Sequence, residues 1–72
     1  MYLVVGINKQ SDDLIINKCD TKPTKKHLSL VKKEIGGEDN VEAHIFTFPV
    51  TMANLVSVLG DDIAHTVFHF CN

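Results

Sequence analysis

The residue types best suited to chemistry gather near the C-terminus, where His65, His69 and Cys71 lie close together in the chain. His65 and His69 have the i, i+4 spacing with which two imidazoles on a helix can share a metal ion. The surrounding residues are rich in β-branched and aromatic side chains, which predict a strand instead. On a strand the two histidines would lie about 13 Å apart, too far to share one ion.

On the predicted strand, His69 and Cys71 would be neighbours on one face, about 6–7 Å apart along the chain. They could form half of a zinc site, which needs two further ligands. His44 or Cys19 could supply them, but no spacing in the sequence brings either residue there. We therefore predict no metal site and no cofactor. The histidines are interpreted as groups on a solvated or partly packed sheet face, or as a pH-sensitive surface.

The sequence carries no pattern typical of a catalytic nucleophile or a phosphate-binding loop. The cysteines and serines lack a nucleophile motif, and no glycine-rich phosphate-binding sequence is present. The acidic pairs Asp12-Asp13 and Asp61-Asp62 are adjacent in sequence, so their side chains point apart and indicate solvated turns. We predict that the protein is not an enzyme and has no catalytic residues.

The basic residues are unevenly distributed, although the net charge is only −2. All are lysines, and five of the seven lie in one segment: Lys22, Lys25, Lys26, Lys32 and Lys33. A basic helix face can bind phosphates, but this one lacks arginine and interleaved aromatic residues. It could therefore be a weak, sequence-independent nucleic-acid site, a docking face for an acidic protein, or an ordinary solvated surface.

Four phenylalanines form two pairs with strand spacing, Phe46 with Phe48 and Phe68 with Phe70. If their strands are neighbours, the four rings could form one cross-strand patch. The patch would be either core beneath helices or, with one pair on an open sheet face, an exposed interface.

Apolar patterns, breakers and caps predict four strands and two helices. Val41–Phe48 carries apolar groups on both faces, which favours an interior strand, and Pro49 ends it. Tyr2–Ile7 is almost wholly apolar, as expected for a strand covered on both faces, and Gly6 within it indicates a bulge or a close backbone approach. The predicted strands are Tyr2–Ile7, Asp13–Cys19, Val41–Phe48 and Ile63–Phe70, and the predicted helices run from Thr24 to Ile35 and over Met52–Leu59.

Thr24 and Thr51 are the predicted helix N-caps, and Gly36 and Gly60 the predicted stops. The first two strands predict an antiparallel hairpin because a short polar turn joins them. Together these elements predict one α+β domain over residues 1–72, in the order β-β-α-β-α-β. Its sheet would be four-stranded and mixed or antiparallel, with both helices mainly on one face.

The 72 residues are 44% hydrophobic, which excludes a disordered composition. No apolar run reaches the ~20 residues that a membrane span needs, and no signal peptide is evident. Two cysteines in such a chain are expected to stay reduced, which predicts a cytoplasmic location, or the host cytoplasm if the chain is phage-encoded.

We predict a non-enzymatic protein-interaction module, such as a small phage-type inhibitor or modulator of a host protein. It would bind through a sheet face or a sheet edge, with the basic helix assisting. A weak nucleic-acid binder and a self-associating subunit, such as a homodimer, are the alternatives. The predicted partner-binding residues are Lys22, Lys25, Lys26, Lys32, Lys33, Phe46, Phe48, His65 and His69.

Overall fold

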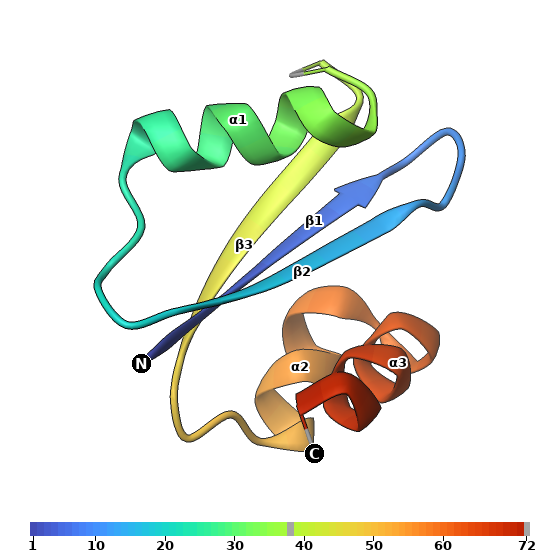
Figure 1. The fold of residues 1–72 in the computed structure, drawn as a ribbon. Coiled ribbons are helices and arrows are strands. Elements are labelled where there is room, and N and C mark those ends of the chain that lie inside the picture. Colours follow the sequence, from blue (N-terminus) through green and yellow to red (C-terminus); the bar gives the residue numbers. More distant parts are fainter. Residues whose placement is uncertain (38, 72) are drawn as a thin grey trace.

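An apolar central strand, β1 (Tyr2–Asn8), organises the computed structural model, which describes residues 1–37 and 39–71. It pairs antiparallel with β2 (Leu14–Cys19) on one side and with β3 (Val41–Thr47) on the other (Figure 1). The sheet is therefore three-stranded, in the order β2-β1-β3. Leu3, Val4 and Val5 are fully buried, which confirms that β1 is covered on both faces.

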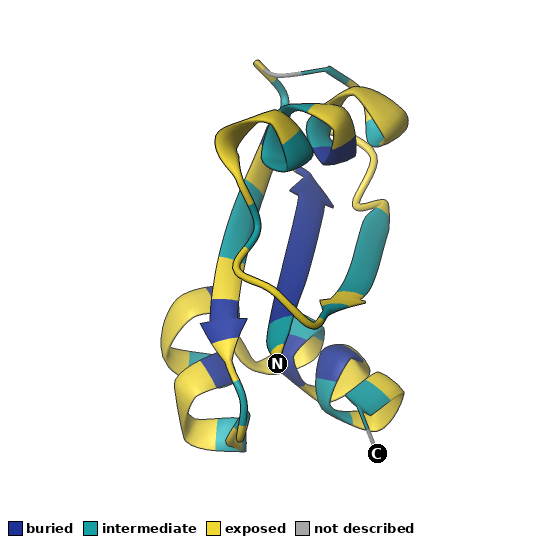
Figure 2. Cartoon of the chain, turned by 60° about the vertical axis from the view of Figure 1, so that its left-hand side comes forward, coloured by how far each residue is buried: buried dark blue, intermediate teal, exposed yellow. Residues whose placement is uncertain are grey.

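Helices cover the two faces of the sheet separately, with α1 (Lys25–Ile35) on one face and α2 (Met52–Leu59) and α3 (Asp61–Cys71) on the other (Figure 1). The larger core lies on the α2–α3 side. There Leu3, Val5, Ile7 and Phe46 of the sheet pack with the helical residues Leu55, Leu59, Ala64 and Val67. Figure 2 shows β1 as a continuous buried strand between more exposed layers.

The sequence left two interpretations of Gly6 open, a bulge or a close approach, and the structure shows a close approach between the sheet and α1. A Cβ atom at this position would lie 2.7 Å from Cγ2 of Ile15 and 2.9 Å from Cγ1 of Val31. Both distances are too short for carbon atoms in contact, so the packing of α1 against β1 and β2 requires glycine here.

The predicted ends of the first two helices are confirmed. Thr24 Oγ1 accepts a hydrogen bond from His27 N at 3.3 Å, and Thr51 Oγ1 accepts one from Asn54 N at 3.2 Å. Gly60 follows α2 with a φ of 84°, a conformation that favours glycine. Leu28, Val31 and Ile35 have the i, i+3, i+7 spacing that predicts one apolar helix stripe, and all three are buried or partly buried on α1.

A buried asparagine joins the end of β1 to the following turn and to α1. Asn8 Oδ1 accepts hydrogen bonds from Gln10 N at 2.9 Å and from Ser11 N at 3.1 Å, and Asn8 Nδ2 donates to the Ile35 carbonyl oxygen. The Phe48–Pro49 peptide bond after β3 is cis.

The prediction of a C-terminal strand over Ile63–Phe70 is wrong, because Asp61–Cys71 forms the helix α3. The two acidic residues at its start complement the helix dipole. Ala64 and Val67 are fully buried on its inner side. This packing outweighs the β propensity of the segment, because β propensity depends strongly on context.

Three other predictions change with α3. The sheet has three strands instead of four, the helices number three in the described residues, and they cover both faces instead of mainly one. Strand β3 lies at an edge and is not interior. The α+β class and the single compact domain hold. The polar residues Glu38-Asp39-Asn40 predict a turn before β3, and Glu38 lies outside the described residues.

Candidate interaction edge

The outer side of β3 presents backbone groups at regular intervals that have no hydrogen-bond partner among the described residues. Phe48 N donates to Met1 O at 3.0 Å, and Lys9 N donates to Asn40 O at 3.0 Å. These bonds fix the alternation of the antiparallel β1–β3 ladder, in which every second residue points its N–H and C=O groups at the neighbouring strand. The backbone groups of Ala43, Ile45 and Thr47 therefore point away from β1, toward the outside of the sheet.

The side chains along this part of β3 are mostly uncharged. Ile45 is 36% exposed on the α1 side, and Thr47 is also exposed. Glu42 is paired, since its Oε1 lies 2.6 Å from Lys9 Nζ and its Oε2 lies 3.5 Å from His44 Nε2. The hydrogen bond from Lys9 is the main reason that the pKa of Glu42 is lowered from its ordinary value. From Ala43 to Thr47, only His44 can carry a charge.

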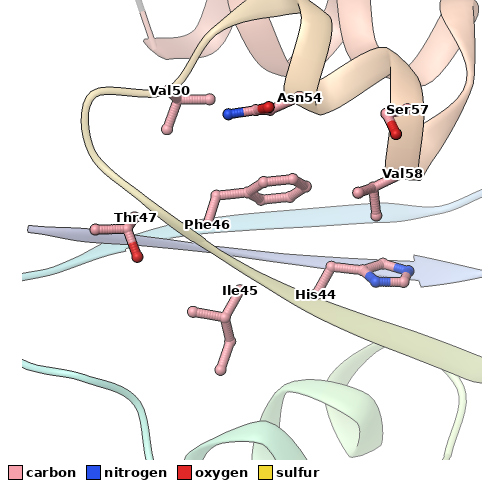
Figure 3. A pocket seen from close by; sticks show the side chains of 8 residues that line it. All are labelled: His44, Ile45, Phe46, Thr47, Val50, Asn54, Ser57 and Val58. Carbon is pink, nitrogen blue, oxygen red and sulfur yellow. The ribbon is translucent and has the colours of Figure 1, made fainter.

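A groove of about 420 Å³ runs beside this edge, between β3 and α2 (Figure 3). Figure 3 shows the Phe46 ring between the strand and the helix, with Val50 and Val58 on the helix side of the groove. Val58 is 49% exposed although it belongs to an apolar helix. The lining residues are His44, Ile45, Phe46 and Thr47 of β3, Val50 of the connection, and Asn54, Ser57 and Val58 of α2.

The opposite edge of the sheet, formed by β2, carries an exposed lysine. Asn8 N donates to Asp13 O at 2.9 Å, so the same alternation turns the backbone groups of Leu14, Ile16 and Lys18 outward. Lys18 is exposed there, and its Nζ lies 5.8 Å from the centroid of the Phe70 ring of α3. A lysine on an edge strand disfavours pairing with another strand.

The five clustered lysines lie on and just before α1, on the other side of the sheet from α2 and α3. Lys22, Lys25, Lys26 and Lys33 are exposed, and Lys32 is partly buried. In residues 1–37 and 39–71 the ion pairs all involve Glu42, so no lysine of the cluster is paired there. Lys26 lines a second groove of about 410 Å³ against α1, together with Glu34 and the 57%-exposed Leu30.

The predicted geometry of His65 and His69 is wrong, because both lie on α3 and not on a strand. Their i, i+4 spacing places them on one helix face, and both are exposed. His65 Nδ1 donates a hydrogen bond to the Asp61 carbonyl oxygen at 2.7 Å, which leaves Nε2 as the free nitrogen. The described residues contain no cluster of three or more potential metal ligands.

Cys19 and Cys71 are free thiols, each partly buried. Cys19 lies at the end of β2, opposite Tyr2, and Cys71 ends α3. The predicted pairing of Cys71 with His69 as strand neighbours fails for the same reason as the histidine geometry.

The predicted four-ring patch does not form, because Phe68 and Phe70 belong to a helix. Phe46 is buried in the core, and Phe48 packs partly against it. Phe70 is 55% exposed but lies beside Lys18, on the β2 side. Of the two predicted residues next to the groove, Phe46 forms part of its wall, whereas Phe48 does not line it.

Sequence reasoning missed Ile45, Asn54 and Val58 as candidate site residues. Val58 lies outside the apolar stripe Met52-Leu55-Val56-Leu59 of its helix. An apolar residue on the outer side of a helix was the one signal in the sequence that could have identified it as a surface residue of interest. Ile45 gave no signal, because its exposure follows from β3 being an edge strand.

No helix in residues 1–37 and 39–71 is long and apolar enough to cross a membrane. The chain matches no protein-family model, and neither a curated protein nor a solved structure is significantly similar to it.

Proposed function

We propose that this protein is a non-enzymatic interaction module that binds a partner protein through the outer edge of β3 and the adjoining groove. The observation that carries the proposal is the outward direction of the backbone groups of Ala43, Ile45 and Thr47 beside a hollow lined by Phe46 and Val58. Sheet edges with neighbouring side-chain pockets are a recurrent mode of peptide recognition. A small inhibitor or modulator of a host protein, such as phages encode, is the narrower form of this proposal.

Side-chain exposure supports the same edge. Ile45 and Val58 are both exposed apolar residues, and both line the groove. The β2 edge offers no comparable surface, since Lys18 stands beside the one large exposed apolar residue there, Phe70.

The test is affinity capture from native lysate with the tagged chain, using a variant of the groove wall. Val58→Asp places a carboxylate in the groove at a position that is already half exposed, so the fold is expected to survive. A protein bound by the wild-type chain should be lost with this variant, because burying the new charge at an interface is unfavourable.

Phe70→Asp is the matched control, since Phe70 is similarly exposed on a helix but lies on the β2 side. The captured protein should be retained by this variant. Equal capture by the wild-type chain and Val58→Asp, or equal loss with both variants, would remove the β3 edge as the binding site.

The basic cluster around α1 gives the proposal an electrostatic component. Five of the seven lysines lie on or just before α1, whereas Asp61 and Asp62 begin α3 on the other face of the sheet. An acidic partner is therefore attracted to the α1 side, which contributes mainly to the association rate. Reversing the charge at Lys25, Lys26, Lys32 and Lys33 should slow association at low salt, and an association rate that does not vary with salt would contradict this steering.

Weak, sequence-independent nucleic-acid binding is the second candidate function. It is favoured by four exposed lysines that have no ion-pair partner among the described residues. Retention on RNA or DNA at low salt should fall steeply as salt rises. Absence of retention at low salt would end this candidate, and capture that disappears after nuclease treatment would favour it over protein binding.

A further inference from the structure

We infer that the partner contributes one extended segment, which adds to β3 as a fourth strand with apolar side chains at alternate positions and runs antiparallel to it, as the paired strands of this sheet do. This inference rests on the proposed function and specifies its ligand. The backbone of β3 sets the chemistry, because a row of N–H and C=O groups at strand spacing is satisfied best by another extended backbone.

The register of the added strand follows from the β1–β3 ladder. Ala43, Ile45 and Thr47 carry the outward groups, so the partner residue opposite Ile45 exchanges two hydrogen bonds with it. The partner residues on either side of that one lie opposite His44 and Phe46. Residues opposite one another in a sheet share a face, so these two side chains point toward α2 and into the groove.

The groove determines which side chains fit. Phe46 and Val58 favour apolar groups of moderate size, and Asn54 and Ser57 provide hydrogen-bonding groups on the α2 side (Figure 3). The partner side chain opposite Ile45 points to the other face, where it meets a residue that is 36% exposed. The recognised segment therefore carries apolar residues at the two positions that face the groove, and the residue between them, opposite Ile45, faces the α1 side.

A single strand fits this site better than a second copy of the protein. Joining β3 to β3 of another copy requires a two-fold axis perpendicular to the sheet, which keeps both α2 helices on the same face. Each α2 already lines the space beside its own β3, with Asn54, Ser57 and Val58 facing the groove. The α2 helix of a second copy would compete with the first copy's α2 for the groove. An extended segment that carries no helix of its own would place only side chains there.

The test is a selection of random linear octapeptides on the immobilised chain, with depletion against Ile45→Pro. Proline removes the outward N–H of Ile45, which forms no bond within the sheet, and proline is tolerated at such edge positions. The matched control is Ile45→Thr, which keeps the N–H group and β-branching. Enriched peptides should carry alternating apolar residues, bind Ile45→Pro at least about tenfold more weakly than wild type, and bind Ile45→Thr within a few-fold of wild type.

A second measurement leaves the protein unchanged. An enriched peptide is synthesised in two N-methylated versions. Each is methylated at alternate amides, so that the first version blocks one edge of the extended peptide and the second version blocks the opposite edge. One version should lose binding and the other should keep it, because only one edge of the peptide faces β3. On binding the unmodified peptide, amide exchange at Ala43, Ile45 and Thr47 should slow, while the amides of His44 and Phe46, already bonded to β1, should change little.

Three outcomes would overturn the inference: no enriched peptide, enriched peptides that bind Ile45→Pro as well as wild type, or equal loss in both N-methylated versions. The inference can fail while the proposed function holds. If a lysate protein is lost with Val58→Asp but is bound equally by Ile45→Pro and Ile45→Thr, the interaction edge stands and strand addition is excluded.

Discussion

The two edges of this sheet expose the same backbone chemistry but differ in their side chains. Along β2 the outward positions include Lys18, whose ammonium group lies over the Phe70 ring. Along β3 the outward positions are Ala43, Ile45 and Thr47, and α2 borders a groove beside them. Edge strands normally carry charge, bulges or cover against unwanted pairing. By this measure the β3 edge is the less protected of the two against pairing with another strand.

The alternation of inward and outward groups on β3 can be tested most strongly with two neighbouring prolines. His44→Pro removes an N–H that bonds β1 and leaves a carbonyl group of β1 unpaired, which should lower the free energy of unfolding by about 1–3 kcal/mol or more. Ile45→Pro removes an outward N–H and should cost less than about 1 kcal/mol. Urea denaturation measures both values, and equal losses would contradict the alternation on which the candidate edge depends.

The β2 side of the sheet should be sensitive to added volume at Gly6, where β1, β2 and α1 are closely packed. Gly6→Ala puts a methyl group 2.7 Å from Cγ2 of Ile15 and 2.9 Å from Cγ1 of Val31, and overpacking of this kind typically costs about 1–3 kcal/mol. Combining it with Ile15→Ala should cost less than the sum of the two single changes, because one of the two short contacts disappears. Additive losses in thermal or urea unfolding would show that Ile15 does not cause the strain.

Lys18→Ile should make the two edges alike. Without the charge, β2 becomes a second apolar edge, and light scattering over a concentration series should show more self-association than for the wild-type chain. The loss of the Phe70 contact should cost only about 0.5–1 kcal/mol in stability. Lys18→Arg keeps the charge and the ring contact and should behave as wild type. If Lys18→Ile associates no more than Lys18→Arg, the charge is not what protects this edge.

The sequence was most informative where local signals and packing agree. The caps at Thr24 and Thr51 and the apolar run of β1 were predicted, because each depends on few neighbours in the chain. The close approach at Gly6 was one of two interpretations, because it depends on Ile15 and Val31 from other elements. The segment from Asp61 to Cys71 was misread because its β-branched and aromatic residues favour a strand locally, whereas burial of Ala64 and Val67 makes it a helix.

That single error also hid the candidate site. A fourth strand at the C-terminus would have placed the chain's own residues in the sheet and left β3 interior, as the sequence predicted. With those residues in α3, β3 becomes an edge and the groove beside Val58 appears. Strand order depends on long-range packing, which periodicity in one sequence does not encode, so Ile45 could not have been identified from its neighbours in the chain.

The smallest expected effect concerns the ion pair that neutralises the start of the β3 edge. The pKa of Glu42 is lowered in the folded protein, chiefly by its hydrogen bond with Lys9, so this carboxylate stabilises the fold above its unfolded-state pKa. That contribution is lost as the pH falls through the lowered folded-state value. It is small because both side chains are well exposed. Lys9→Met should reduce the difference in stability between neutral and acidic pH, with Lys33→Met, which lies outside any described ion pair, as the control. An unchanged pH dependence in Lys9→Met would mean that the pair does not couple the ionisation of Glu42 to folding.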